Sequence, residues 1–277
     1  MNRLFTNLCM VAMLVFHISC NDSVMDLESP SVEMKTRAVN QRAHNLIQQA
    51  RQGDVEAYSS LALCYRDGNG VEQSWLNMIC MYAIYCQKTG GNIDDVIELF
   101  EEGHPFRLLF EIVEMPCSNE DAEAKMDQLR QLAPAEAKAV EAAKRSLSME
   151  DATSALSIIR EAEDEGSEFA IILQAAYYDQ ATDRTGQEEY FTRIAEKYPF
   201  FNQLLGDLYA KKYGDSEDFS YIQKAMECYY KADAFGMLIP KYANKLWGMY
   251  DYFSPKGLLE SDEQEIERLK ILSKRTY

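Results

Sequence analysis

Few side chains in this sequence could act as nucleophiles, metal ligands or acid–base pairs. Beyond the first 19 residues there are two histidines, His44 and His104, and neither lies in an HExxH or CxxC arrangement. The chain also has no G-x-G-x-x-G, P-loop or G-x-S-x-G motif. We therefore expect no cofactor and no bound metal, and we interpret both histidines as solvent-facing or turn residues.

Acidic side chains are the one abundant source of chemistry, since a pair of carboxylates can act as general acid and base. They occur in runs, which include Asp94, Asp95, Glu98, Glu101, Glu102, Glu111, Glu114, Glu161, Glu163, Asp164 and Glu165. Runs of charge on an amphipathic helix usually form its solvent-exposed face. We therefore expect no catalytic residue among them, and we predict that the chain is not an enzyme.

Five cysteines follow Cys20 in the sequence, and two interpretations of them stay open. They are Cys64, Cys80, Cys86, Cys117 and Cys228, an odd number, so at least one is unpaired. Cys64 and the pair Cys80 and Cys86 fall on successive predicted helices, which allows one disulfide between them. The simpler expectation is that they are buried free thiols that pack as small apolar side chains.

The charge balance excludes some classes of partner. The 277 residues contain 28 Lys and Arg against 45 Asp and Glu, a net charge of −17. Such a chain repels phosphate backbones, so we expect no nucleic-acid binding, and it disfavours a basic patch that docks on anionic lipid. A partner is expected to be neutral or basic, and its binding to weaken as salt increases.

The N-terminus has the form of an export signal. Arg3 precedes an apolar run of about nine residues, which is too short to span a bilayer. The run ends in Ile18-Ser19-Cys20, which resembles the lipobox of bacterial lipoproteins, although His17 stands where that motif has Leu. The resemblance implies a signal peptide over residues 1–19 and acyl chains (palmitate among them) on Cys20, which would hold the chain on a membrane.

The residues after Cys20 indicate a flexible tether and a location in the cell envelope. Residues 20–34 are polar, contain Pro30 and lack helical periodicity, so we interpret them as a flexible lipidated linker. In lipoproteins an Asp directly after the cysteine tends to retain the protein in the inner membrane, and Asn21 stands there instead. The resemblance therefore implies a lipid-anchored protein of the bacterial cell envelope, in the outer membrane, facing either the periplasm or the cell surface.

From about Lys35 onward the pattern of apolar residues is helical, and no alternating strand is evident. Helix starts are indicated by Asp54, by Asn92–Asp95, by the S-x-x-D at Ser118 and by a capping box that begins at Ser261. Prolines mark further starts, at Pro105, Pro134, Pro199 and Pro240, and glycines mark ends, at Gly53, Gly68, Gly90, Gly103, Gly166, Gly214, Gly236 and Gly257. The sequence predicts an all-α protein of about 14 helices joined by short turns.

A unit recurs within this helical pattern. Leu and Tyr occur four residues apart, and so on one helix face, at Leu61/Tyr65, Leu173/Tyr177, Leu205/Tyr209 and Leu246/Tyr250. Two segments resemble Sel1-like repeats, a branch of the tetratricopeptide (TPR-like) superfamily. The first matches at Ala57, Leu61, Ala62, Tyr65, Gly68, Gly70 and Val71, and the second at Leu205, Gly206, Tyr209, Lys224, Ala225, Tyr229, Lys231, Ala232 and Gly236. Gly206 and Ala225 are expected to let two helices pack closely.

The resemblance implies a helix-pair solenoid, a Sel1-like superhelix, over residues 35–277 and a function in protein or peptide binding. In such repeats the ligand contacts come from first-helix positions, which here would include Ser59, Arg66, Asn202 and Lys211. The sequence does not show which of these face a groove, and the partner-binding residues stay unknown. The alternative is a helical envelope hydrolase or a glycan-binding accessory lipoprotein.

Overall fold

The computed structural model describes residues 39–114, 119–147, 152–180 and 184–274, and within these ranges every regular element is a helix. The prediction of an all-α protein is therefore confirmed at the level of fold class. The predicted signal peptide, the predicted tether, the lipidation candidate Cys20 and Cys117 lie outside the described residues. Among the helices that the structure does describe, none is both long and apolar enough to cross a membrane.

The helices divide between two compact units. The middle unit, residues 93–182, contains η1 (Ile93–Leu99), α5 (Pro105–Glu114), α6 (Asn119–Leu132), α7 (Pro134–Leu147), α8 (Ala152–Asp164) and α9 (Glu168–Gln180). The terminal unit joins residues 39–92 to residues 183–277. It contains α2 (Gln41–Arg51), α3 (Val55–Asp67), α4 (Trp75–Thr89), α10 (Arg184–Ala195), η2 (Pro199–Phe201), α11 (Asn202–Ser216), α12 (Ser220–Asp233), α13 (Pro240–Phe253), η3 (Ser254–Lys256) and α14 (Glu263–Ser273).

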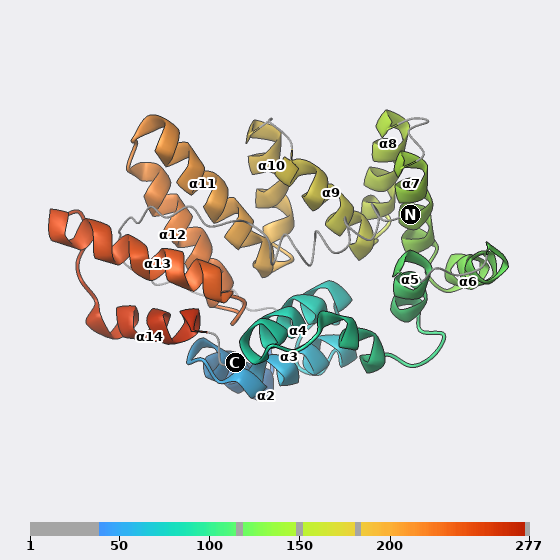
Figure 1. Ribbon diagram of the computed structural model, residues 1–277, viewed down its shortest axis with the longest axis horizontal. Coiled ribbons are helices and arrows are strands. Elements are labelled where there is room, and N and C mark those ends of the chain that lie inside the picture. The colour runs from blue at the N-terminus through green and yellow to red at the C-terminus, as the bar shows by residue number, and fades with distance from the viewer. Residues whose placement is uncertain (1–38, 115–118, 148–151, 181–183, 275–277) are drawn as a thin grey trace. The chain divides into compact units, whose positions relative to one another are not determined.

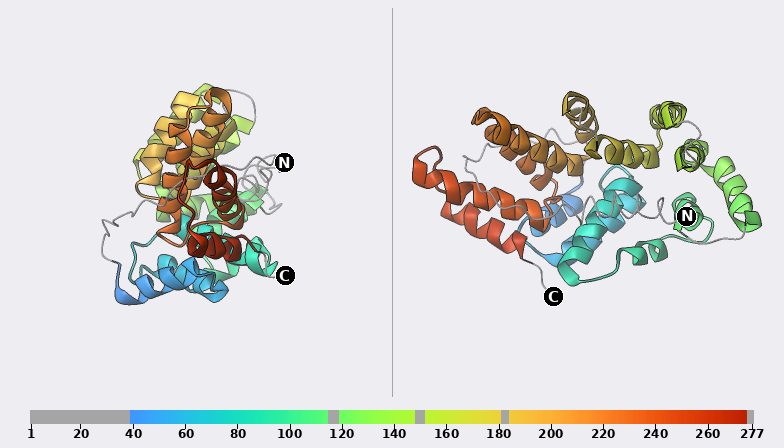
Figure 2. Two further views of the ribbon diagram at one scale, coloured as in Figure 1. Left: turned by 90° about the vertical axis from the view of Figure 1, so that its left-hand side faces the viewer. Right: turned by 45° about the horizontal axis from the view of Figure 1, so that its top comes forward.

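Successive helices pack as pairs inside each unit, because the turns between them are short. In the terminal unit α3 packs on α4, α11 on α12, and α13 on α14, as the views in Figures 1 and 2 show. In the middle unit α7 packs on both α8 and α9.

Most helix boundaries follow from the residues that predict them. The Asp54 side chain accepts a hydrogen bond from Glu56 N at the start of α3, and Pro105, Pro134 and Pro240 are the first residues of their helices. Gly68 and Gly90 end α3 and α4 with φ of +67° and +73°, the left-handed region that glycine enters at little cost.

Three boundaries differ from the prediction. Gly214 does not end a helix: α11 continues through it to Ser216 and stops at Glu217, whose φ is +56°. The start of α14 is capped by Asp262 rather than Ser261, because the Asp262 carboxylate accepts from Glu265 N at 3.0 Å. Residues 93–99 form a 3-10 helix instead of the start of an α-helix.

The predicted close approach at Gly206 is confirmed. A Cβ added to Gly206 of α11 would lie 2.6 Å from the Tyr229 ring and 3.0 Å from the Ala225 carbonyl oxygen of α12. Any side chain there would push the two helices apart. The Leu/Tyr pattern holds less generally: Leu61, Tyr65, Leu246 and Tyr250 are buried, whereas Tyr177 is 51% exposed on α9.

Contacts far apart in the sequence hold the terminal unit together. The buried Asp233 carboxylate binds Arg51 at 3.1 Å and Arg268 at 2.9 Å, and Arg268 also donates to the Arg51 carbonyl oxygen. The buried ammonium group of Lys88 donates to the Leu272 carbonyl oxygen near the end of α14, at 2.9 Å. These bonds join residues 39–92 to the C-terminal helices, although 90 residues of the middle unit intervene in the chain.

Candidate binding pocket

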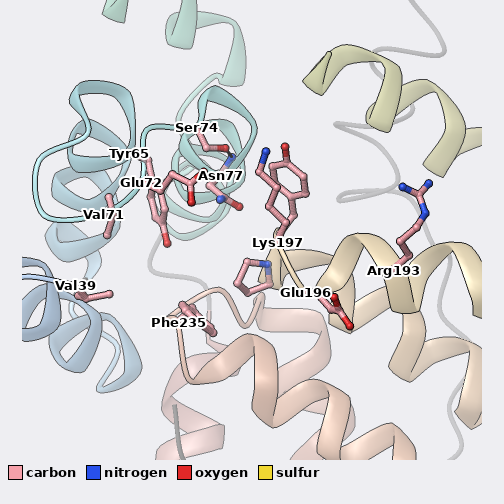
Figure 3. Close-up of a pocket in the computed structure, with 12 residues that line it drawn as sticks. Val39, Tyr65, Val71, Glu72, Ser74, Asn77, Arg193, Glu196, Lys197 and Phe235 are labelled. Carbon is pink, nitrogen blue, oxygen red and sulfur yellow. Dashed lines mark hydrogen bonds between the residues drawn. The ribbon is translucent and has the colours of Figure 1, made fainter. Parts of the chain in front are cut away.

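A pocket of about 390 Å³ opens within the terminal unit, a size that suits part of a peptide or a small molecule. Three segments build it (Figure 3): the chain around α3 and the start of α4, the turn from α10 into η2, and the residue Phe235 after α12. Val39, directly before α2, completes the lining.

The lining changes in character from floor to rim. The floor is formed by buried residues, most of them apolar or aromatic: Tyr65, Val71, Ser74, Asn77, Tyr198 and Pro199. The rim carries four exposed charged side chains, Glu72, Arg193, Glu196 and Lys197. Two carboxylates and two cations cancel in charge, so the pocket as a whole is neutral.

Ser74 fixes the start of α4 at the floor of the pocket. Its hydroxyl accepts a hydrogen bond from Asn77 N at 3.1 Å, which is the N-cap bond that stabilises a helix start. Its own backbone N–H donates to the Tyr65 carbonyl oxygen at 3.0 Å. The backbone N–H groups of Ser74 and Asn77 are therefore bonded without any help from the Asn77 side chain.

The Asn77 side chain is the polar group at the floor that lacks a partner. Asn77 is only 6% exposed, and its Oδ1 is a buried acceptor with no hydrogen bond from any of the residues that the structure describes. In a capping box the side chain at this helix position returns to the backbone N–H of the cap residue. That N–H belongs to Ser74 and is already bonded to Tyr65, so Asn77 is left facing the pocket.

The opposite wall supplies a cation and an aromatic ring. Figure 3 shows Lys197 facing Asn77 and Glu72 across the pocket, with Arg193 and Glu196 farther out. The Lys197 ammonium lies 5.1 Å from the centre of the Tyr198 ring, a distance at which the ring face attracts a cation. Tyr65 and Tyr198 are 5% and 3% exposed, so neither ring offers an open face.

This arrangement suits the binding of a neutral chain that carries both hydrogen-bond donors and apolar groups. A buried acceptor without a partner costs free energy that a ligand N–H or O–H would recover. The apolar floor would gain from covering by an apolar group, and the rim charges could orient polar atoms at the edge.

The four first-helix residues expected to line a groove do not form one site. Asn202 is 7% exposed, and its Nδ2 donates to the Pro199 carbonyl oxygen at 3.0 Å, so it holds a turn. Ser59 donates to the Glu56 carbonyl oxygen of its own helix, and Arg66 pairs with Asp67. Lys211 is exposed on α11. None of the four lines the pocket.

Most of the other residues singled out from the sequence form hydrogen bonds or ion pairs within the fold. His104 Nδ1 accepts from Phe106 N at the start of α5, as expected for a turn histidine, and His44 is half-buried on α2. Glu111 pairs with Arg107 and Lys125, and Lys138 pairs with Glu161 and Glu165. Among the described residues, no group of His, Cys, Asp and Glu has the geometry to hold a metal ion.

The described cysteines are buried and form no disulfide with one another. These are Cys64, Cys80, Cys86 and Cys228, which are 3–5% exposed. Burial raises the pKa of the Cys228 thiol to about 12 and also raises that of Cys64. A thiol with a raised pKa is a poor nucleophile at neutral pH, so Cys64 and Cys228 act as small apolar packing groups.

Sequence reasoning missed the pocket because its walls come from distant parts of the chain. The one local signal was Ser74 three residues before Asn77, which has the spacing of a capping box but lacks the usual Glu or Gln. No spacing rule connects that segment to Tyr198 or Phe235. The chain matches no known protein family, and no curated protein or solved structure is similar to it at a significant level.

Proposed function

We propose that this chain is a non-catalytic binding protein of the bacterial cell envelope, anchored through acyl chains on Cys20, whose helical-repeat scaffold holds a peptide segment of another protein. The observation that carries the proposal is the neutral pocket of the terminal unit, with its apolar floor and charged rim. A solenoid built from Sel1-like helix pairs is part of the same proposal. The repeat spacing and the close packing at Gly206 support it.

A peptide suits this pocket better than a glycan does. Sugars bind on exposed aromatic faces, whereas the rings of Tyr65 and Tyr198 are almost fully covered. A peptide brings a main-chain N–H for each residue other than proline, together with apolar side chains of the size that the floor can cover.

In-cell photo-crosslinking tests the proposed function. A benzophenone amino acid replaces Phe235, which lines the pocket and is half-buried. A matched control replaces Tyr252, which is 40% exposed on α13 and does not line the pocket. We expect a crosslinked protein at position 235 that is absent at 252, and a synthetic peptide from the crosslinked segment that binds the purified chain.

Two results would count against the binding function. One is a partner peptide that binds equally well after Phe235→Asp, since that change places a charge in the pocket. The other is turnover of peptidoglycan or another glycan by the purified protein, lost when one carboxylate pair is mutated, because this would make the chain a hydrolase.

The anchor has a separate test. Cys20→Ala should move the protein from the membrane fraction to the soluble fraction and abolish labelling by a fatty-acid analogue, because the thiol is the acylation site. Labelling that persists in the Cys20→Ala protein would remove the lipid anchor from the proposal and leave the pocket unaffected.

A further inference from the structure

We infer that Asn77 is the recognition residue of the pocket: its side-chain Oδ1 accepts a main-chain N–H from a neutral, extended peptide. This inference rests on the proposed function and identifies the atom that recognises the ligand. Three observations carry it: burial of the acceptor, the lack of a partner for it, and its position on the floor of a ligand-sized pocket.

None of the residues that the structure describes donates a hydrogen bond to Asn77 Oδ1. The helix start is capped by Ser74, and the Ser74 N–H is bonded to Tyr65. A buried polar atom without a partner destabilises the free protein, whereas an apolar side chain of similar size would not. Selection for binding can retain a residue that destabilises the fold, and such residues are expected at binding pockets.

The class of ligand follows from the neighbours of Asn77. The four rim charges cancel, so neither a strongly basic nor a strongly acidic segment is favoured. The buried floor residues Tyr65, Val71 and Pro199 favour an apolar side chain beside the bonded N–H. The expected ligand is therefore a short uncharged stretch with one apolar residue, flanked by polar residues that reach the rim.

The chain offers a matched control for Asn77. Asn202 is equally buried, at 7% against 6%, and lies in the same unit, but its amide donates to the Pro199 and Ala195 carbonyl oxygens. Replacing each by Leu removes one amide of the same size. The first replacement removes an acceptor to which no described residue donates, and the second removes the side-chain donor that bonds two carbonyl oxygens.

The first arm of the experiment measures melting temperatures of the full chain. We expect Asn77→Leu to raise the melting temperature by about 2–4 °C and Asn202→Leu to lower it by at least as much. A fall for Asn77→Leu similar to that for Asn202→Leu would overturn the inference, because it would show a structural role. The peptide-binding function could then still be judged on its own by the crosslink at Phe235.

The second arm uses seven-residue linear peptides, selected on the wild-type chain from a random phage-displayed library. The backbone nitrogens of a selected peptide are then methylated one at a time. At one position methylation should weaken binding about tenfold, the change in affinity expected for the loss of one hydrogen bond. That loss should vanish in Asn77→Leu, since the methylated nitrogen and Asn77 share the bond.

Two outcomes of this arm would overturn the inference. If the methylation loss is unchanged in Asn77→Leu, another atom reads the peptide, and the proposed function survives without Asn77. If no peptide is retained but a panel of monosaccharides and disaccharides raises the wild-type melting temperature, both the inference and the peptide function are wrong.

Discussion

The middle and terminal units are both all-helical, yet they distribute charge and aromatic residues in opposite ways. Residues 93–182 contain 7 Lys and Arg against 21 Asp and Glu, a net charge of −14. Residues 39–92 and 183–277 contain 18 against 20, a net charge of −2. The terminal segments also hold both tryptophans and 15 of the 17 tyrosines.

The difference shows that the total charge of the chain comes mainly from the unit that does not contain the pocket. The net charge of −17 predicts a neutral or basic partner and salt-sensitive binding, but most of that charge belongs to the middle unit. The pocket lies in the almost neutral terminal unit.

The two units also differ in how deeply the ion pairs described below are buried. In the terminal unit Asp207 and Asp233 are nearly fully buried and bonded to cations on other helices. Burial alone would raise the pKa of Asp207, but the Lys245 and Lys241 ammonium groups outweigh it and lower that pKa below its usual value. In the middle unit Arg130 pairs at the surface with Glu123, Asp127 and Glu141. The same interaction is therefore expected to matter far more in one unit than in the other.

The largest predicted effect comes from a buried pair of the terminal unit. Asp233→Ala leaves Arg51 and Arg268 without their shared carboxylate and should lower the free energy of unfolding by about 3 kcal/mol. Urea unfolding followed by circular dichroism measures it. The matched change Asp127→Ala in the middle unit should leave the urea midpoint unchanged, and equal losses in the two variants would contradict the comparison.

A pair of glycines in α11 should give opposite effects. Gly206→Leu forces a side chain against Tyr229 and should cost about 1–3 kcal/mol by overpacking. Gly214 has open space around it within the same helix, so Gly214→Ala should stabilise by about 0.5–1 kcal/mol. Thermal unfolding compares the two, and a Gly206→Leu protein as stable as wild type would disprove the close helix packing.

Lys88 makes the free energy of unfolding of the terminal unit depend on pH, and this effect is the next in size. Burial lowers the pKa of Lys88 from its usual 10.5 to about 8. Between these pH values the unfolded chain binds more protons than the folded chain, so stability should rise with pH above about 8. The rise should amount to about 1–3 kcal/mol.

Lys88→Met isolates this contribution. The difference in unfolding free energy between wild type and Lys88→Met should change between pH 7.5 and 9.5 in favour of the wild type. Above that range the buried tyrosines, among them Tyr58 with its pKa raised by burial, also contribute. A difference that does not vary with pH would show that Lys88 titrates normally.

The smallest predicted effect is that of salt on ligand binding. Since the lining of the pocket is neutral, the affinity for a selected peptide should change by less than about twofold between 50 and 500 mM NaCl. Isothermal titration calorimetry measures it. A steep loss of affinity with salt would place the binding surface on the acidic middle unit instead.

The sequence predicted local structure well and the site poorly, for a physical reason. Helix starts at Asp54 and Pro240 and the close packing at Gly206 depend on neighbours within a turn or within one helix pair. The pocket brings Asn77 together with Lys197, 120 residues later in the chain. That pairing depends on long-range contacts such as those of Asp233 and Lys88, for which a single sequence has no periodic signal.

The groove residues expected from the repeat resemblance illustrate the same limit. Asn202 has the residue type and repeat position of a ligand contact, but a turn that begins at Pro199 takes up its amide. Asn77 is also an asparagine, at a position that no motif marks. Its Oδ1 accepts no hydrogen bond from the described residues. Which asparagine is available depends on the hydrogen bonds around it, and these are visible only in the fold.

Hydrogen–deuterium exchange with and without a selected peptide tests the central claim most directly, since it reports on both units of the intact chain at once. We predict slower exchange in residues 65–77 and 193–199 on peptide addition, with no change in residues 93–182. Protection confined to residues 93–182, or to α11 around Lys211, would contradict the assignment of the binding site to the pocket.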